Sequence, residues 1–258
     1  MPRLVLAALA LCAGGVHAEV PHKLTVTAGY TNFTDGVGDR GVVAFESATR
    51  FGRNTLALNG AAGSRNFGAG PSYDGASIGA TLWHDWSDVV STRSSVTKSS
   101  DDPVFVNTIL DQDVTYHGLR NTALTLGAKY SDYFDDRHSM AWYAAGAYYF
   151  KRLTVRYRYT HYDLSHVGDS HANLLSFRFR DAEGAGYTQL WLGEGTGIHD
   201  YEWAPIALPG DFESVALRRI QPLGRNWLGE VGFDKSWHRT PAYDYQALTV
   251  SAGLTHNW

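Results

Sequence analysis

A short stretch past the middle of the chain brings together the residue types of a hydrolase. THYDLSH, residues 160–166, contains His161, Asp163, Ser165 and His166. A serine nucleophile needs a histidine base within hydrogen-bond reach and a carboxylate that orients the base. Neighbouring residues of a strand or turn usually point apart, so closeness in sequence does not establish such a triad.

No further catalytic signal accompanies these residues. The sequence has no H-E-x-x-H pattern and no spacing typical of metal ligands. His199 stands beside Asp200 in a later polar segment, where solvation alone explains polar residues. We therefore predict a protein that is not an enzyme, with no catalytic residues, no metal and no cofactor. A hydrolase of lipid or peptide that uses His166 or His199 is kept as an alternative.

A second set of residues is cationic. In VRYRYTHYD, residues 155–163, two arginines alternate with apolar and aromatic residues, and in SFRFR, residues 176–180, two more do the same. Successive residues of a strand point to opposite faces, so each strand has one apolar and one charged face. The two faces must meet different surroundings. The four residues are Arg156, Arg158, Arg178 and Arg180.

The same alternation recurs in segments of about ten residues along nearly the whole chain. Examples are residues 24–30, 121–130, 172–180 and 245–258. No amphipathic helix, linker or second domain interrupts them. The segment count predicts an all-β, antiparallel up-and-down barrel of about 14 strands, with 12 as the alternative.

The connections between these segments alternate between two kinds. Tight turns are predicted at residues 51–54, 117–121, 150–152 and 223–226, whereas the other connections are polar or extended, with the longest at residues 195–210. Short connections at one end and longer loops at the other are typical of outer-membrane barrels. An even strand count also predicts both termini in the periplasm.

The N-terminus predicts export. Residues 1–18 combine Arg3, an apolar run and the small-residue pattern ending at Ala18, which is typical of a cleaved signal peptide. The apolar run is shorter than the roughly 18 residues that span a membrane as a helix. Cys12 is the only cysteine, and lipidation there is the alternative to removal with the signal. The predicted mature domain is residues 19–258.

Composition excludes two classes of protein. The formal net charge is −4, and removal of Arg3 makes it −5, with acidic and basic residues interspersed, which argues against a nucleic-acid partner. A mean hydropathy of −0.26 is too polar for a helical membrane protein. The 15 Tyr, 8 Trp, 11 Phe and 27 Gly favour turn-rich β structure.

A soluble periplasmic sandwich would also alternate, but aromatic residues near segment ends favour a membrane barrel. We expect them to form girdles at the two lipid interfaces. Trp258 ends the last alternating segment and resembles the assembly signal of outer-membrane proteins, which predicts outer-membrane lipid and the barrel assembly machinery as partners in a Gram-negative outer membrane. The girdle candidates are Trp83, Trp86, Tyr133, Phe150, Trp227 and Trp237.

In such a barrel the four arginines must face the lumen, since an arginine facing lipid costs roughly 2–4 kcal/mol near the midplane. Their mutual repulsion calls for acidic partners or an anionic solute. Either a salt-bridge network fills the lumen, or a basic wall guides a solute. The acidic candidates are Glu46, Asp85, Glu194, Glu230 and Asp234.

Aromatic and amide side chains near this wall are candidate solute contacts, because rings stack on sugars and amides bond to hydroxyls. These are Tyr162, Gln189, Trp191 and Glu194. The longest loop is a candidate constriction, through His199, Asp200, Tyr201 and Trp203.

Specific strings add a family resemblance. The run from Arg156 to Pro205, with RYTHYD, GYTQLWL and GTG, is followed by SVALRRIQPL at residues 214–223, and TAGY and DDPVF occur earlier. Together they resemble the YaiO-type family of outer-membrane β-barrels. The resemblance implies a single-domain barrel without a cofactor. The family has no agreed catalytic or binding site, so no functional residue is carried over.

The predicted function is a passive or secretion-linked pore for a polar solute such as an exopolysaccharide. The polysaccharide link is an analogy of fold and setting. A structural or adhesive barrel with a plugged lumen is the first alternative, and the outer-membrane hydrolase is the second.

Overall fold

The computed structural model describes residues 22–100, 102–134, 137–165, 168–182, 185–196, 210–240 and 244–258. The predicted signal peptide lies outside these ranges, and within them no helix has the length and apolarity to cross a membrane. Fourteen strands are described: β1 (His22–Phe33), β2 (Gly38–Phe51), β3 (Asn54–Asn66), β4 (Ser72–Asp85), β5 (Val90–Ser99), β6 (Thr108–Leu119), β7 (Thr122–Asp132), β8 (His138–Tyr149), β9 (Leu153–Leu164), β10 (Gly168–Arg180), β11 (Tyr187–Thr196), β12 (Asp211–Pro222), β13 (Trp227–Arg239) and β14 (Asp244–Asn257).

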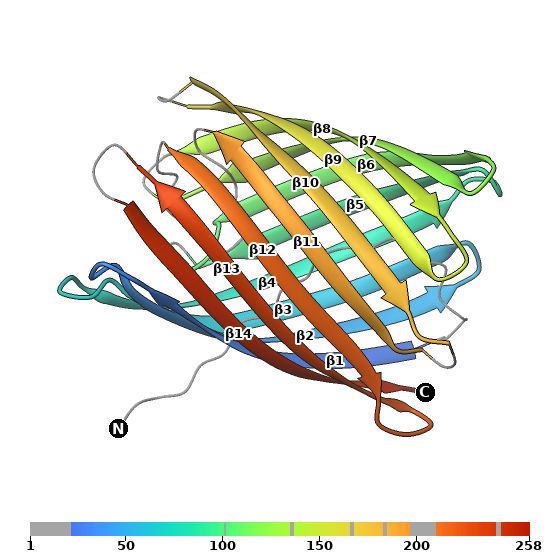
Figure 1. Ribbon diagram of the computed structural model, residues 1–258, viewed down its shortest axis with the longest axis horizontal. Helices are drawn as coiled ribbons and strands as arrows, with labels where there is room; N and C mark the ends of the chain where they lie inside the picture. Colours follow the sequence, from blue (N-terminus) through green and yellow to red (C-terminus); the bar gives the residue numbers. More distant parts are fainter. Residues whose placement is uncertain are drawn as a thin grey trace.

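The strands form one closed antiparallel barrel in which each pairs with its neighbours in sequence (Figure 1). β1 closes the barrel against β14, with Lys23 opposite Asn257 and Phe33 opposite Ala247. The predicted barrel and its strand count of 14 are confirmed. Closure leaves no edge strand with unpaired backbone groups, which is the condition for spanning a membrane with strands.

The two ends of the barrel differ in their connections. β1 begins and β14 ends at the same end, which we call the terminal end; the other is the far end. Connections at the terminal end are residues 52–53, 86–89, 120–121, 150–152, 181–186 and 223–226. Those at the far end include the longest two, residues 100–107 and 197–210. The tight turns predicted from the sequence all lie at the terminal end, and the longest loops lie at the far end.

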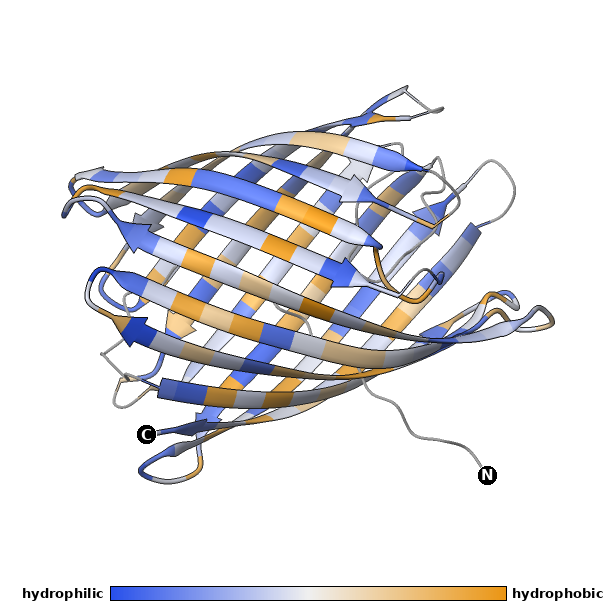
Figure 2. Cartoon of the chain, turned by 180° about the vertical axis from the view of Figure 1, so that it is seen from behind, coloured by the Kyte–Doolittle hydropathy of each residue, from blue (hydrophilic) through white to orange (hydrophobic). Residues whose placement is uncertain are grey.

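Most strands expose large apolar side chains on their outer face. Hydrophilic and hydrophobic residues alternate along the ribbons (Figure 2). On β14, Val250 is 51% exposed and lies between Tyr30 of β1 and Phe233 of β13, both also exposed. The next residue, Ser251, lies between Gly29 and Gly232 on the inner face. Large apolar side chains on the outside of a closed barrel are typical of a surface that meets lipid.

Aromatic side chains ring the terminal end. Most strands that run toward this end have an exposed aromatic residue at or near their last residue, which suits the interface between acyl chains and headgroups. The ring consists of Phe51, Trp86, Tyr116, Phe150, Phe179, Trp227 and Trp258.

Two of the predicted girdle residues lie elsewhere. Trp83 pairs with Arg93 and shares its inward face, because the alternation of β4 turns Leu82 rather than Trp83 toward lipid. Tyr133 is 2% exposed and lies just beyond β7, with its hydroxyl 3.3 Å from the Ser139 hydroxyl. Both were expected on the outer face.

The inner wall is uneven around the barrel. The inner faces of β14 and β1–β4, which we call the small wall, carry mainly small residues at mid-height, such as Ala44, Ala57, Ser77 and Gly79. The inner faces of β5–β12, which we call the charged wall, carry long polar side chains such as Arg93, Arg156 and Arg178 among small residues such as Ala145. Side chains of the charged wall can therefore extend into space that the small wall leaves.

Candidate functional site

The four predicted arginines lie together on the charged wall. Arg156 and Arg158 belong to β9, and Arg178 and Arg180 to β10. Arg156 lies opposite Ser176, which places Arg178 one diagonal step away. Their strand neighbours Tyr157 and Phe179 are exposed on the outer face, so the alternation directs the guanidinium groups inward.

Two of these arginines, Arg158 and Arg178, contact neutral partners. Arg178 Nε donates to Gln189 Oε1 at 3.0 Å, and its guanidinium lies 4.7 Å from the centre of the Tyr187 ring. Arg158 Nε donates to Thr160 Oγ1 at 3.2 Å and stacks on Tyr143 at 3.8 Å. Among the described residues none of the four forms an ion pair with a carboxylate. Their charge is thus directed at the lumen.

This arrangement has a calculable cost. Side chains one diagonal step apart on paired strands lie about 7 Å apart. Two like charges at about 7 Å repel by about 0.6 kcal/mol in water and by about 2.4 kcal/mol at an effective dielectric constant of about 20. The wall is therefore much less costly in a hydrated lumen, or with anions present, than in a dry one.

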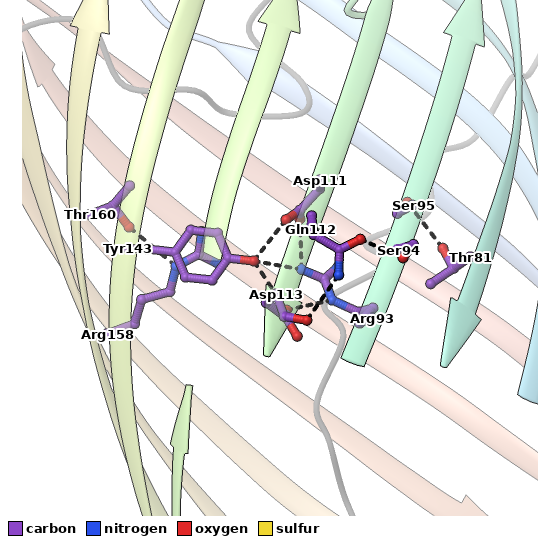
Figure 3. Close-up of polar contacts among 10 residues, drawn as sticks. All are labelled: Thr81, Arg93, Ser94, Ser95, Asp111, Gln112, Asp113, Tyr143, Arg158 and Thr160. Carbon is purple, nitrogen blue, oxygen red and sulfur yellow. Dashed lines mark hydrogen bonds and ion pairs between the residues drawn. The ribbon is translucent and has the colours of Figure 1, made fainter. Parts of the chain in front are cut away.

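Beside the arginines lies an ion-pair network (Figure 3). Arg93 of β5 donates to Asp111 at 2.7 Å and to Asp113 at 2.8 Å, both on β6. The Tyr143 hydroxyl donates to Asp111 at 2.7 Å and accepts from Arg93 at 2.9 Å. Arg158 stacks on the same tyrosine ring, so the network joins β5, β6, β8 and β9. Ser94 and Gln112, also drawn in Figure 3, point to the outer face.

The network depends on a glycine. Tyr143 crosses over Gly127 of β7, and a Cβ atom at residue 127 would lie 2.2 Å from Tyr143 Cζ. Gly127→Val should therefore displace Tyr143 and lower the free energy of unfolding by roughly 1–3 kcal/mol. Urea titration of the refolded barrel measures this.

Gly146→Val is the matched control on β8. A Cβ atom at residue 146 would meet only Leu124 Cδ2, at 3.8 Å. This variant should unfold at nearly the wild-type urea concentration. Equal destabilisation by both substitutions would contradict the role of Gly127.

The acidic residues predicted from the sequence lie apart from the four arginines. Glu46 accepts from Lys23 at 2.6 Å, Asp85 lies 3.8 Å from Arg50, and Glu230 pairs with Arg218. Asp234 is buried on β13, and its Oδ1 atom has no hydrogen-bond partner within the described part of the chain. Asp111 and Asp113, which hold Arg93, were not among the predicted residues.

One ion pair lies on the outer surface of the barrel, at the terminal end. Arg219 of β12 points outward and donates to both carboxylate oxygens of Asp181, at 2.7 and 2.6 Å, in the β10–β11 connection. These hydrogen bonds hold the pKa of the Asp181 carboxyl below its usual value. The pair ties the connection to the neighbouring hairpin.

Of the predicted solute contacts, three face the lumen. Gln189 is held by Arg178, while Trp191 and Tyr162 are each 7% exposed and thus largely covered by neighbouring side chains. Glu194 was expected beside Gln189 but lies on the outer face, because it is an even number of residues from Leu192 and an odd number from Trp191. Its carboxylate accepts from Asn173 at 3.4 Å near the far end.

Several predicted residues lie outside the described ranges. They are His166, His199, Asp200, Tyr201 and Trp203. Trp258 is described: it is 53% exposed and stacks on His256 at 5.5 Å and on His22 at 6.0 Å, at the seam of the barrel. Its role in assembly stays a prediction.

The described residues do not assemble a hydrolase site around THYDLSH. His161 points outward, 3.7 Å from Asp169, and Ser165 Oγ accepts instead from the backbone N–H of His138. Residues 75–79, GASIG, match the G-x-S-x-G pattern of serine hydrolases, which was not predicted as a site. Here the serine lies within strand β4 rather than in a strand-to-helix turn.

A serine and a histidine do meet on β13. The hydroxyl of Ser236 lies 2.8 Å from His238 Nε2. Ser236 has no exposed surface, so no substrate can reach it in this arrangement. Among the described residues no group of three or more His, Cys, Asp or Glu side chains could hold a metal ion.

Comparisons with known proteins agree with this geometry. A model of the YaiO membrane β-barrel domain matches residues 21–202. Among solved structures, the CymD monoaromatic hydrocarbon channel has a TM-score of 0.63 at 8% identity, covering 93% of this chain and 89% of that one. A bacterial polysaccharide outer-membrane secretin has a TM-score of 0.58 at 10% identity, covering 94% and 100%. The translocator domain of the autotransporter NalP from Neisseria meningitidis has 0.54 at 12%, covering 94% and 90%. At these identities the likeness concerns the fold, that of an outer-membrane barrel with channel-like neighbours.

Proposed function

The chain belongs to the YaiO family of membrane β-barrels, and from this premise we propose that it forms a pore for a polar, anionic solute, specifically a polysaccharide with acidic groups. The solute would pass through the lumen along Arg156, Arg158, Arg178 and Arg180. We assign the barrel no catalytic step.

The observation that carries the proposal is the absence of carboxylate partners for these four arginines among the described residues. A salt-bridge network built only to fill the barrel would pair its charges, as Arg93 and Arg218 do. Guanidinium groups are suited to carboxylate and phosphate recognition. Positive charge without carboxylate partners, on the low-dielectric wall of a hydrated channel, also raises the local concentration of anions.

The lumen chemistry helps to choose between the structural neighbours. A path for monoaromatic hydrocarbons, as named for CymD, would need an apolar lining. The charged wall instead favours a hydrated solute, as in the neighbour named as a polysaccharide secretin. Strand count is compatible with either, since barrels of about eight strands are filled by side chains and those of roughly 16–18 enclose water.

The setting completes the proposal. We infer that residues 1–18 direct export and are removed, that residues 19–258 form the mature domain, and that the barrel assembly machinery inserts it in the outer membrane with Trp258 as part of its signal. The aromatic ring at the terminal end would lie at the periplasmic interface. The far end would then open to the cell exterior.

Planar bilayers containing the refolded mature protein test this function. We expect discrete conductance steps and a reversal potential in a KCl gradient that shows preference for chloride. Polygalacturonate should reduce the current in a concentration-dependent way, whereas neutral dextran of the same length should have a much weaker effect. Cation preference, or equal block by both polymers, would contradict an anionic solute.

A further inference from the structure

The connection between β5 and β6 folds into the barrel at its far end. Residues 103–107, PVFVN, are all buried, and Val104 has no exposed surface. Connecting segments normally run over the surface and are polar. A buried apolar run within a connection therefore indicates a complementary apolar surface on the inner wall of the barrel.

The receiving surface is the small wall. Val104 and Phe105 pack against Val42 of β2, with Ala61 of β3 and Tyr73 of β4 beside them. These wall residues face inward, as the register of β2, β3 and β4 shows. The segment therefore lies inside the lumen.

Two glycines make room for it. A Cβ atom at Gly63 would lie 3.1 Å from Phe105 Cζ, as well as 2.5 Å from Val42 Cγ2. A Cβ atom at Gly75 would lie 2.4 Å from Asp102 Oδ1. Larger residues at these positions would push the segment away from the wall.

Hydrogen bonds fasten the segment in place. Arg40 Nη2 donates to the Val104 carbonyl at 3.0 Å, and its guanidinium lies 5.4 Å from the centre of the Phe105 ring. The Val104 N–H donates to Asp102 Oδ1 at 3.0 Å, and Ser99 Oγ donates to the Val106 carbonyl. The inward position thus has its own polar contacts as well as apolar ones.

We propose that residues 102–107 are the constriction that sets the size limit of the lumen at the far end. β2–β4, which hold the segment, lie across the barrel from β9–β11, which include the arginine-bearing strands. The segment therefore occupies the side of the lumen where small residues would otherwise leave a wide passage. Apolar groups at a narrow point also resist the passage of water and ions. The proposal rests on the proposed function only in that solutes cross this lumen.

The test replaces Pro103–Val106 with Gly-Ser-Gly-Ser in the full mature barrel. Single-channel conductance should rise several-fold, and neutral dextrans too long to enter the wild-type pore should enter the variant and reduce its current. Heat-dependent mobility in detergent gels verifies that the variant is folded.

Two single substitutions distinguish the loss of the hydrogen bond that holds the segment from the loss of a positive charge in the lumen. Arg40→Ala removes the hydrogen bond to Val104 and should give noisy, frequently larger openings. Arg65→Ala is the matched control, since this inward arginine donates to the carbonyls of Val37, Asp39 and Asn66, at the far ends of β2 and β3. Because these bonds do not reach residues 102–107, the variant should leave the conductance steps close to wild type.

The outcomes separate this inference from the proposed function. If the wild type conducts and the Gly-Ser variant has the same conductance and size limit, the constriction is refuted and the pore stands. If only the variant conducts, residues 102–107 close the resting barrel, which supports the constriction and contradicts a passively open pore. If neither conducts, both proposals fail.

Discussion

Val250→Arg should strongly destabilise the folded barrel. Val250 lies at the middle of β14, 51% exposed, between the apolar rings of Tyr30 and Phe233. An arginine facing lipid near the midplane costs roughly 2–4 kcal/mol, which is a large part of the stability of a typical domain. The folded fraction, read from heat-dependent mobility after refolding into lipid vesicles, should fall accordingly.

Ser251→Arg provides the control one residue away. Its side chain would point to the inner face between Gly29 and Gly232, where it can reach water. It should refold to nearly the wild-type extent. The assignment of lipid and lumen faces would be contradicted if Ser251→Arg were the more damaging change.

Arg156→Ala with Arg178→Ala should abolish most of the preference for anions. Each unit charge at about 7 Å from an ion in water contributes about 0.6 kcal/mol, or about a threefold change in local ion concentration. The reversal potential in a KCl gradient should therefore move toward the cation-selective value, and the block by polygalacturonate should weaken.

The control removes two arginines from the outside of the wall. Arg219 and Arg239 both point outward and pair with Asp181 and Glu213. Arg219→Ala with Arg239→Ala changes the net charge by the same amount, yet should leave the reversal potential nearly unchanged. A similar shift in both double variants would mean that selectivity reflects total charge and not the charged wall.

Much of the fold could be predicted because period-2 alternation is a local property of the sequence. Segments such as residues 24–30 show which residues share a face, and a strand that alternates apolar with charged residues can be placed in a barrel without knowing its partners. The resemblance carried by RYTHYD and GYTQLWL pointed to the family that the match over residues 21–202 shows. Strand count followed from the turn signals.

The errors in the predicted site arise where a shift of one residue changes the face of a side chain, or where its partner is distant in sequence. Glu194 was grouped with Trp191 although the same alternation places it with Leu192, and Trp83 was placed outside although it shares a face with Arg93. The D-x-D pattern of Asp111 and Asp113 was a usable signal of an inward acidic pair. Their contact with Tyr143 depends on Gly127 two strands from Arg93, which no local pattern reports.

One connection that enters the lumen was not predicted. The constriction predicted in the longest loop lies outside the described residues and stays a prediction, whereas residues 102–107 enter the described lumen. The signal was present in DDPVF, since an apolar run inside a polar connection indicates a buried contact. Such a segment is not identified by the length of the connection, because a shorter connection can also fold inward where glycines of the wall leave room for it.

The most direct measurement is thiol accessibility at residue 156 in a conducting barrel. The only cysteine is Cys12, within the predicted signal peptide, so residues 19–258 with Arg156→Cys carry a single thiol. During single-channel recording, a negatively charged methanethiosulfonate reagent should lower the current in discrete, irreversible steps and reduce anion preference. Protection of the thiol by polygalacturonate is expected as well. A current that never responds, while Tyr157→Cys on the outer face behaves identically, would contradict a solute path along the charged wall.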